Sequence, residues 1–275
     1  MSEYFEFEKH GKKYLISAKN DHYGISFWRN FSNMSYEPDT QALLEVFCNP
    51  NTVFMDIGAA NGSMTILAAS LGANVWAYEP NPHVFQSLHS NIYLNPSLVD
   101  SVQLINKAVS IENSTLNTSS TNLSEVLTPI VFTKWSSLTP IEVISILDEV
   151  ARCRELNPES EIVIKMDIEG AEWKILSSEL VLESLQREKV VLILALHPGL
   201  HRPIGNGKTL SLRFRSLIWN AKNAVDAHRL YSRLNRFATI QRTNLNIVRR
   251  PIHFCLLILG GSHEFVIKFI GKPRG

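Results

Sequence analysis

The chain has 275 residues, 45% of them apolar and 19% charged, so it can bury a sizeable core and does not have the composition of a disordered protein. Its longest uninterrupted apolar stretch, Val190–Leu196, is far shorter than the ~20 residues that cross a bilayer. Its first residues lack the basic and apolar segments of a secretion signal. Three scattered cysteines indicate neither a disulfide framework nor a zinc ribbon. We therefore expect a cytoplasmic globular protein with one large domain.

Charge is divided unevenly along the sequence. Residues 1–200 contain 13 Lys and Arg against 24 Asp and Glu, whereas residues 201–275 contain 14 against 2. The basic C-terminal quarter can attract an anionic partner at close range. The alternative is that the two oppositely charged regions simply face each other across the fold.

The first fifty residues have the pattern of a cover rather than of a core. Two alternating segments within 4–17 flank Gly11 and predict a hairpin. A short amphipathic helix follows Glu37 and ends before Asn49-Pro50. We therefore divide the chain into an N-terminal cover, 1–50, and a main domain, 51–275, with an insertion at about 198–236.

From residue 52 onward, short apolar runs alternate with helical periodicity. This alternation predicts an α/β fold with a mostly parallel twisted sheet and helices on both faces. The expected strands are 52–57, 73–79, 102–106, 161–167 and 190–196, and the expected helices are 62–71, 82–94, 140–154 and 170–185. Two late strands, within 237–248 and 254–269, follow each other without a helix between them and predict an antiparallel ending.

The ends of the first two strands carry the residues that suggest a ligand site, because ligands of open parallel sheets bind beyond the carboxyl ends of the strands. The first strand ends at Asp56, and Gly58 and Gly62 then allow a tight turn. Glu79 closes the second strand, twenty-three residues after Asp56. At that spacing an acidic side chain can accept the hydroxyl hydrogens of a ribose.

Asp56 distinguishes between two classes of ligand at this turn. Dinucleotide-binding folds place a pyrophosphate there, and a carboxylate would repel it. S-adenosylmethionine has no phosphate and carries a positive amine and sulfonium, so Asp56 favours it over a nicotinamide cofactor. The remaining alternative is a tight strand-to-helix turn that binds no ligand.

Five segments together resemble the FkbM-type family of S-adenosylmethionine-dependent methyltransferases. They are Val53–Gly62, Val75–Pro82, Asn91–Asn95, Asn106–Ser110 and Ile164–Glu172, within a match over about 36–200. The last segment is the most family-specific. The resemblance implies a Rossmann-like class I methyltransferase fold, with S-adenosylmethionine as cofactor.

The resemblance also implies roles for individual residues. Asp56 and the backbone of the turn would hold the methionine end of the cofactor, Glu79 would bind the ribose, and Asn81, Asn106 and Ala108 would border the adenine. Asp167 would lie beside the methyl group, and Glu37 would close the pocket. The full implied cofactor set is Asp56, Gly58, Ala59, Asn61, Gly62, Glu79, Pro80, Asn81, Asn106, Ala108, Asp167 and Glu37.

Transfer of a methyl group to a hydroxyl needs a group that takes up the proton. The candidates are Asp167, Lys165 and His197. Asp167 can instead cap the helix expected near residue 170. The family often has a carboxylate two residues before His197, but here the residue is Ala195, so we expect no metal site.

The basic C-terminal region predicts a long helix over 209–236 with a basic residue every seven positions. Such a stripe is usually a solvated face. The sharper hypothesis is that it attracts an anionic small-molecule or glycan acceptor, and nucleic acid is the alternative partner. By resemblance, the expected reaction is O-methylation of a sugar or secondary metabolite; the alternatives are a non-catalytic binding protein and an RNA-directed methyltransferase.

Overall fold

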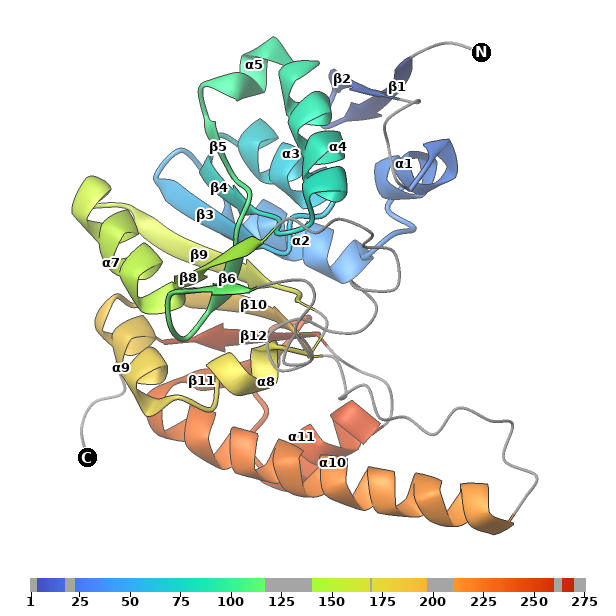
Figure 1. The fold of residues 1–275 in the computed structure, drawn as a ribbon, viewed down its shortest axis with the longest axis vertical. Coiled ribbons are helices and arrows are strands. Elements are labelled where there is room, and N and C mark those ends of the chain that lie inside the picture. The colour runs from blue at the N-terminus through green and yellow to red at the C-terminus, as the bar shows by residue number, and fades with distance from the viewer. Residues whose placement is uncertain are drawn as a thin grey trace. The chain divides into compact units, whose positions relative to one another are not determined.

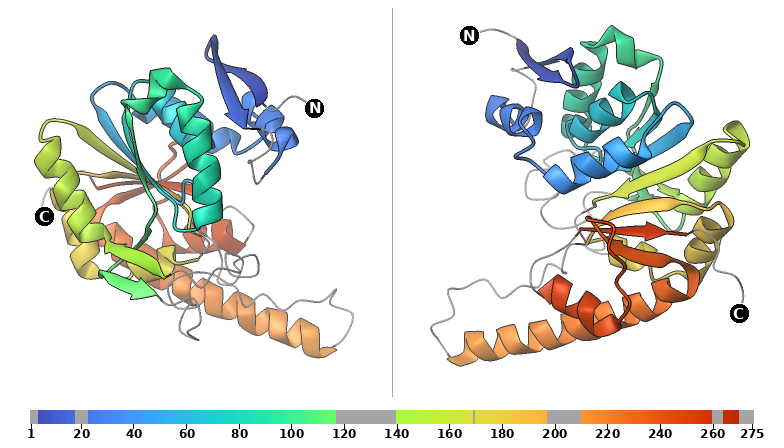
Figure 2. Two further views of the ribbon diagram at one scale, coloured as in Figure 1. Left: turned by 45° about the horizontal axis from the view of Figure 1, so that its top comes forward. Right: turned by 180° about the vertical axis from the view of Figure 1, so that it is seen from behind.

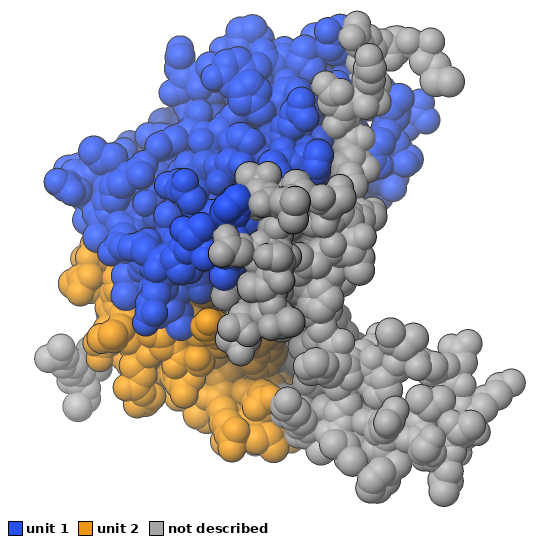
Figure 3. Space-filling model, viewed as in Figure 1, with its two compact units in different colours: residues 1–120, 137–166 blue, residues 121–136, 167–275 orange. Residues whose placement is uncertain are grey.

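The structure, a computed structural model, describes residues 4–17, 23–116, 140–168, 170–196, 210–259 and 264–269, without the side chains of 210–223 and 256–259. The chain forms two compact units (Figure 3). Unit 1 comprises residues 1–120 and 137–166, and unit 2 comprises residues 121–136 and 167–275. The domain boundary between residues 50 and 51 and the insertion at about 198–236 stay predictions.

Unit 1 is built around four parallel strands in the order β9-β3-β4-β5 (Figure 1). A smaller sheet has the order β6-β8-β7. The elements of unit 1 are β1 (Tyr4–Lys9), β2 (Lys12–Ser17), α1 (Ile25–Ser32), α2 (Pro38–Phe47), β3 (Thr52–Ile57), α3 (Ser63–Ser70), β4 (Asn74–Tyr78), α4 (Pro82–Tyr93), α5 (Pro96–Val99), β5 (Val102–Ile105), β6 (Ala108–Ser110), β7 (Ser114–Leu116), β8 (Ile141–Ser145), α7 (Ile146–Leu156) and β9 (Glu161–Met166). The Rossmann-like α/β class with a mostly parallel sheet is confirmed.

Helices cover both faces of this sheet, as predicted. Asp56 of β3 lies beside Ala77 of β4 in the register, so Asp56 and Tyr78 project from opposite faces. On one face, the Thr65 hydroxyl of α3 donates to Asp56 across 2.7 Å. On the other face, the Tyr78 hydroxyl donates to Glu149 of α7 across 2.7 Å. Every residue of β3 is buried, because this strand has a neighbour on each side and a helical layer on each face.

The predicted N-terminal hairpin is present and carries an aromatic core. β1 and β2 pair antiparallel around Gly11, whose φ is 70°. Phe7 of β1 stacks on Trp28 of α1 with a centroid distance of 5.2 Å and meets Phe31 edge-on at 5.7 Å. The helix α1, which the sequence analysis did not predict, therefore packs on the hairpin through buried rings.

Unit 2 contains an antiparallel sheet in the order β10-β12-β11. Its elements are α8 (Glu172–Ile175), α9 (Glu179–Arg187), β10 (Val191–Ala195), α10 (Leu210–Phe237), β11 (Thr239–Arg242), α11 (Pro251–Leu259) and β12 (Glu264–Lys268). The predicted antiparallel C-terminal strand is confirmed, since β12 runs opposite to β10. Among the described helices, none has both the length and the apolarity that crossing a membrane requires.

Three predictions about secondary structure were wrong in detail. The late strands do not follow each other directly, because α11 lies between β11 and β12. Its apolar run has no period that separates strand from helix, and Pro251 fits the first turn of a helix. The helix expected over 140–154 begins as β8, and the one expected over 170–185 is divided between α8 and α9, where Ser178 caps α9.

Gly62 provides a test of the packing between α3 and α4. Its φ is +89°, and an added Cβ would lie 2.6 Å from Cδ1 of the buried Leu88. We expect Gly62→Ala to lower the free energy of unfolding by about 3 kcal/mol, from left-handed strain plus overpacking. Gly11→Ala, with φ +70° and nothing within 4 Å of the added Cβ, is the control and should cost about 1 kcal/mol. Equal losses in urea denaturation would contradict the packing argument.

Candidate active site

The predicted site lies at the carboxyl ends of β3 and β4. The turn Gly58–Gly62 follows β3, and Glu79–Asn81 follows β4. Left-handed backbone occurs at alternate positions of the turn, with φ of 89° at Gly58, 51° at Ala60 and 89° at Gly62. Ala60 adopts this conformation without being a glycine, at a cost of ~1 kcal/mol. The turn must therefore be held by its surroundings.

Hydrogen bonds within the protein hold this turn. The N–H groups of Gly58 and Ala59 both donate to the carbonyl oxygen of Tyr78, each across 3.0 Å. The Ala60 N–H donates to Glu79 Oε2 across 3.1 Å. The amides that a pyrophosphate would need are thus already engaged by the chain itself.

Glu79 is the buried carboxyl group that joins the two loops. It is only 8% exposed, and its Oε1 accepts the N–H of Asn81 across 2.8 Å while Oε2 accepts that of Ala60. Burial raises the pKa of Glu79 to about 7; the two backbone donors oppose this shift, and the charge of Asp56 adds to it. Near neutral pH the carboxyl group therefore exists in both protonation states.

Asp56 is fully buried beneath the turn. Besides accepting the Thr65 hydroxyl, it is the register partner of Lys165 in β9, so the two side chains project from the same face. Lys165 is itself buried. An acidic and a basic side chain thus lie on adjacent strands below the turn.

The Cys48 thiol is buried as well. Burial, with a contribution from the charge of Asp56, raises the pKa of Cys48 to about 12 and keeps that thiol protonated.

The residues predicted to border the adenine gather around Glu79. The Asn106 side chain donates to the carbonyl of Glu79 across 2.7 Å and to that of Pro80 across 3.3 Å. Asn81 caps α4 by accepting backbone N–H groups of its first turn. Ala108 is buried at the start of β6. These residues fix the loop after β4, a structural role that the sequence did not reveal.

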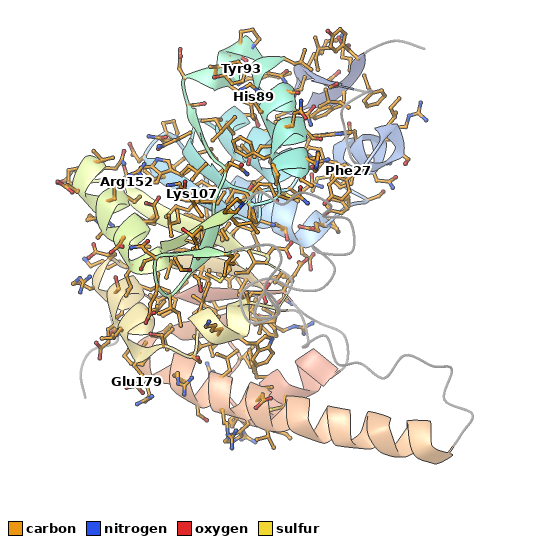
Figure 4. The ribbon with its side chains drawn as sticks, in the orientation of Figure 1. Phe27, His89, Tyr93, Lys107, Arg152 and Glu179 are labelled. Atoms are coloured by element: carbon orange, nitrogen blue, oxygen red, sulfur yellow. The ribbon has the colours of Figure 1, made fainter. Side chains whose placement is uncertain are left out.

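A second buried network supports β4 from its other face. The Tyr78 hydroxyl donates to Glu149, and Arg152 on α7 (Figure 4) lies 3.5 Å from the same carboxylate. The Arg152 guanidinium lies 4.5 Å from the ring centroid of Trp76. Burial, and then the Glu149 carboxylate, raise the pKa of Tyr78, so its hydroxyl keeps the donating proton. Tyr78, whose carbonyl accepts two N–H groups of the turn, is therefore held in place through its side chain.

Glu37 occupies a strained position at the start of α2. Its φ of 41° is left-handed, and its side chain makes no capping bond. The fully buried Gln41 donates to the carbonyl of Tyr36 across 2.5 Å and so holds the backbone just before Glu37. Glu37 thus marks the strained start of α2, which only residues 48–51 separate from β3. Strain at such a place is typical of functional sites.

Asp167 follows β9 directly and belongs to unit 2. It does not cap α8, whose N-cap is Ala171 without a side-chain bond. The turn after Asp167 is instead held by the buried Glu172, which accepts the N–H groups of Ile168 and Gly170, each across 2.7 Å. His197 lies outside the described residues.

The model of the methyltransferase FkbM domain matches residues 56–202, just over half of the chain. The chain belongs to the FkbM methyltransferase family. The match begins at Asp56 and includes the turn, Glu79, Lys165 and Asp167. S-adenosylmethionine is accordingly the cofactor of this methyltransferase.

Solved structures resemble the chain more distantly. M. jannaschii TYW2 in complex with AdoMet is 14% identical with a TM-score of 0.35, over 80% of this chain and 74% of that one. Precorrin-6y C5,15-methyltransferase from Geobacter metallireducens is 13% identical with a TM-score of 0.30, over 68% and 71%. P. horikoshii TYW2 in complex with MeSAdo is 20% identical with a TM-score of 0.26, over 37% and 35%.

The chain spans only 35% of the length of P. horikoshii TYW2 and 37% of the length of another P. horikoshii protein. No curated protein matches the chain.

The geometry of this FkbM-family site fits its cofactor. Two buried carboxyl groups, Asp56 and Glu79, lie at the turn and favour a positively charged ligand. The amides of Gly58, Ala59 and Ala60 are engaged within the protein. A ligand without a phosphate does not need these amide donors, so their internal hydrogen bonds do not weaken its binding.

The pKa of Glu79 predicts how stability depends on pH. Its carboxyl group loses the proton near pH 4.5 when unfolded and near pH 7 when folded. Its contribution to stability is therefore full below pH 4.5 and is lost as the pH rises through 7. We expect wild type, relative to Glu79→Gln, to lose about 2 to 3 kcal/mol between pH 5 and pH 8. Urea denaturation at both pH values measures this, and a constant difference would contradict it.

Proposed function

We propose that this methyltransferase transfers the methyl group of S-adenosylmethionine to a hydroxyl group of a sugar or secondary metabolite. The observation that carries the cofactor assignment is the internally bonded turn beside the buried carboxyl group of Glu79. When bound, S-adenosylmethionine supplies a methyl group on a sulfonium, which is already an activated leaving group. The protein must then position the acceptor, exclude water and take up one proton.

The proposed cofactor contacts follow from which groups the turn leaves available. The N–H groups of Gly58 and Ala59 donate to Tyr78, and the carbonyls of Ala59, Asn61 and Gly62 accept donors of the protein. The carbonyl oxygens of Gly58 and Ala60 are therefore the groups that we propose bind the methionine ammonium. Asp56 adds negative charge beneath them. Glu79, in its ionised form, accepts the ribose hydroxyls. Glu37, which makes no capping bond, closes the pocket.

The proton of the acceptor hydroxyl goes to one of three candidates in this proposal. Asp167 directly follows β9, and His197 follows β10 with only Leu196 between them. Lys165 is buried within β9, and it could serve only if desolvation made it neutral. Asp167 is favoured over Lys165, because Lys165 shares the sheet face of the buried Asp56.

Calorimetric titration tests the cofactor site. We expect wild type to bind S-adenosylhomocysteine and not NAD at pH 8. Glu79→Gln should weaken that binding by about tenfold or more, since an ionised acceptor is lost. Glu179→Gln changes a carboxyl group of unit 2 that pairs with Arg236 and is the control, expected within about threefold of wild type. Tighter binding of NAD would overturn the cofactor argument.

The acceptor is tested by methyl transfer to three classes of compound. The cations that unit 2 shows on α10 are partly neutralised: Arg236 pairs with Glu179, and Arg229 lies 3.8 Å from Asp226. We therefore propose that only the basic side chains without such a partner attract an anionic acceptor.

Production of S-adenosylhomocysteine with a nucleotide-linked sugar or a glycoside, but not with RNA, would support the proposal. Turnover with RNA alone would replace it, and no turnover by a cofactor-binding protein would favour the non-catalytic alternative.

A further inference from the structure

The second strand of the N-terminal hairpin meets α4 through its backbone. β2 pairs with β1 along one edge, and its other edge faces α4 (Figure 2). Asn95 Oδ1 accepts the N–H of Leu15 across 2.9 Å, and Asn95 Nδ2 donates to the carbonyl of Leu15 across 2.8 Å. One side-chain amide thereby makes both bonds that a neighbouring strand would make to this residue.

Asn91 makes a different connection. It lies one helical turn before Asn95 and is fully buried. Its Oδ1 accepts the N–H of Ser17, the last residue of β2, across 3.0 Å. Its Nδ2 donates to the carbonyl of Asn61, in the turn after β3, also across 3.0 Å. A single buried amide therefore joins the hairpin to the candidate cofactor turn.

The orientation of the Asn91 amide is fixed by its two partners. Turning the amide over would place Nδ2 against the N–H of Ser17 and Oδ1 against the carbonyl of Asn61, which are two repulsive contacts in a buried place. The backbone of Asn91 is held as well, because its carbonyl accepts Asn95 Nδ2 across 2.7 Å. The amide therefore has one favourable arrangement.

The peptide that Asn91 holds joins Asn61 to Gly62, at the end of the turn. Its N–H group, that of Gly62, donates to the carbonyl of Ala59 across 2.9 Å and so closes the turn. Gly62 is left-handed and lies against Leu88 of α4. Because the peptide is planar, a rotation of the Asn61 carbonyl would change φ of Gly62 and turn its N–H away from Ala59.

We propose that Asn91 is a positioning residue of the S-adenosylmethionine site. Its amide fixes the carbonyl of Asn61 and thereby holds the Gly62 N–H, in the same peptide plane, on the carbonyl of Ala59, the hydrogen bond that closes the turn. The N-terminal hairpin supplies the anchor through Ser17, so it contributes to the site without touching the cofactor. This inference rests on the proposed cofactor site.

Two variants with the same chemical change separate positioning from general stabilisation. Asn91→Asp keeps the acceptor for Ser17 but places a carboxylate oxygen against the carbonyl of Asn61. Asn95→Asp makes the same change four residues away, against the carbonyls of Leu15 and Asn91, and does not touch the turn after β3. Because the side-chain amide of Asn95 donates to two carbonyls and that of Asn91 to one, the unfolding temperature of Asn95→Asp should fall at least as far as that of Asn91→Asp.

We expect Asn91→Asp to weaken binding of S-adenosylhomocysteine at least about tenfold and Asn95→Asp by less than about threefold. Amide hydrogen exchange of residues 58–62, measured without cofactor, should accelerate in Asn91→Asp alone. Equal affinities and equal exchange in the two variants would overturn the inference. If either aspartate variant does not fold, Asn91→Ala and Asn95→Ala make the same comparison, with the same expected order of affinity and exchange.

The two measurements also separate this inference from the proposed function. Wild type that binds no S-adenosylhomocysteine contradicts the proposed function, whatever the variants do. The exchange comparison needs no cofactor, so equal exchange contradicts the positioning role even when wild type binds.

Discussion

The carboxyl group of Glu79 is the constraint on which the rest of the site depends. It accepts one N–H from the turn after β3 and one from the loop after β4, so two loops that are far apart in the sequence have a single geometry. Burying a carboxyl group is unfavourable, and the two backbone donors offset only part of that cost, which is why its pKa lies near 7. A group poised in this way gains from any ligand that donates hydrogen bonds to it.

The surrounding residues make that geometry reproducible. From one face of the sheet, Tyr78 is held by Glu149, and its carbonyl receives two amides of the turn. From the other face, Thr65 of α3 binds the buried Asp56. Asn106 closes the loop after β4. The proposed site is therefore preorganised by hydrogen bonds that also stabilise unit 1.

The sequence predicted the parts of the fold and site that depend on local pattern. Parallel strands that are buried on both faces have continuous apolar runs, and the acidic residues that end β3 and β4 were found by their position. The apolar run of α11 could not be assigned, because it lacks a period. The role of Asn91 was out of reach, since its partners are 74 and 30 residues away in the chain. The role of Glu172 could have been predicted, because the N–H groups that it accepts belong to residues only two and four positions before it.

The side-chain amides of Asn91, in α4, and Asn95, two residues after α4 ends, also bear on solubility. A strand edge with unsatisfied N–H and C=O groups is a template for pairing with another chain. The edge of β2 that does not pair with β1 lies in a segment that contains Tyr14, Leu15 and Ile16. The two amides bind the N–H and carbonyl of Leu15 and the N–H of Ser17 on that edge, which leaves fewer groups to recruit strands of other molecules. Separation of the hairpin from this helix would open a route to aggregation even in a chain whose central sheet is intact.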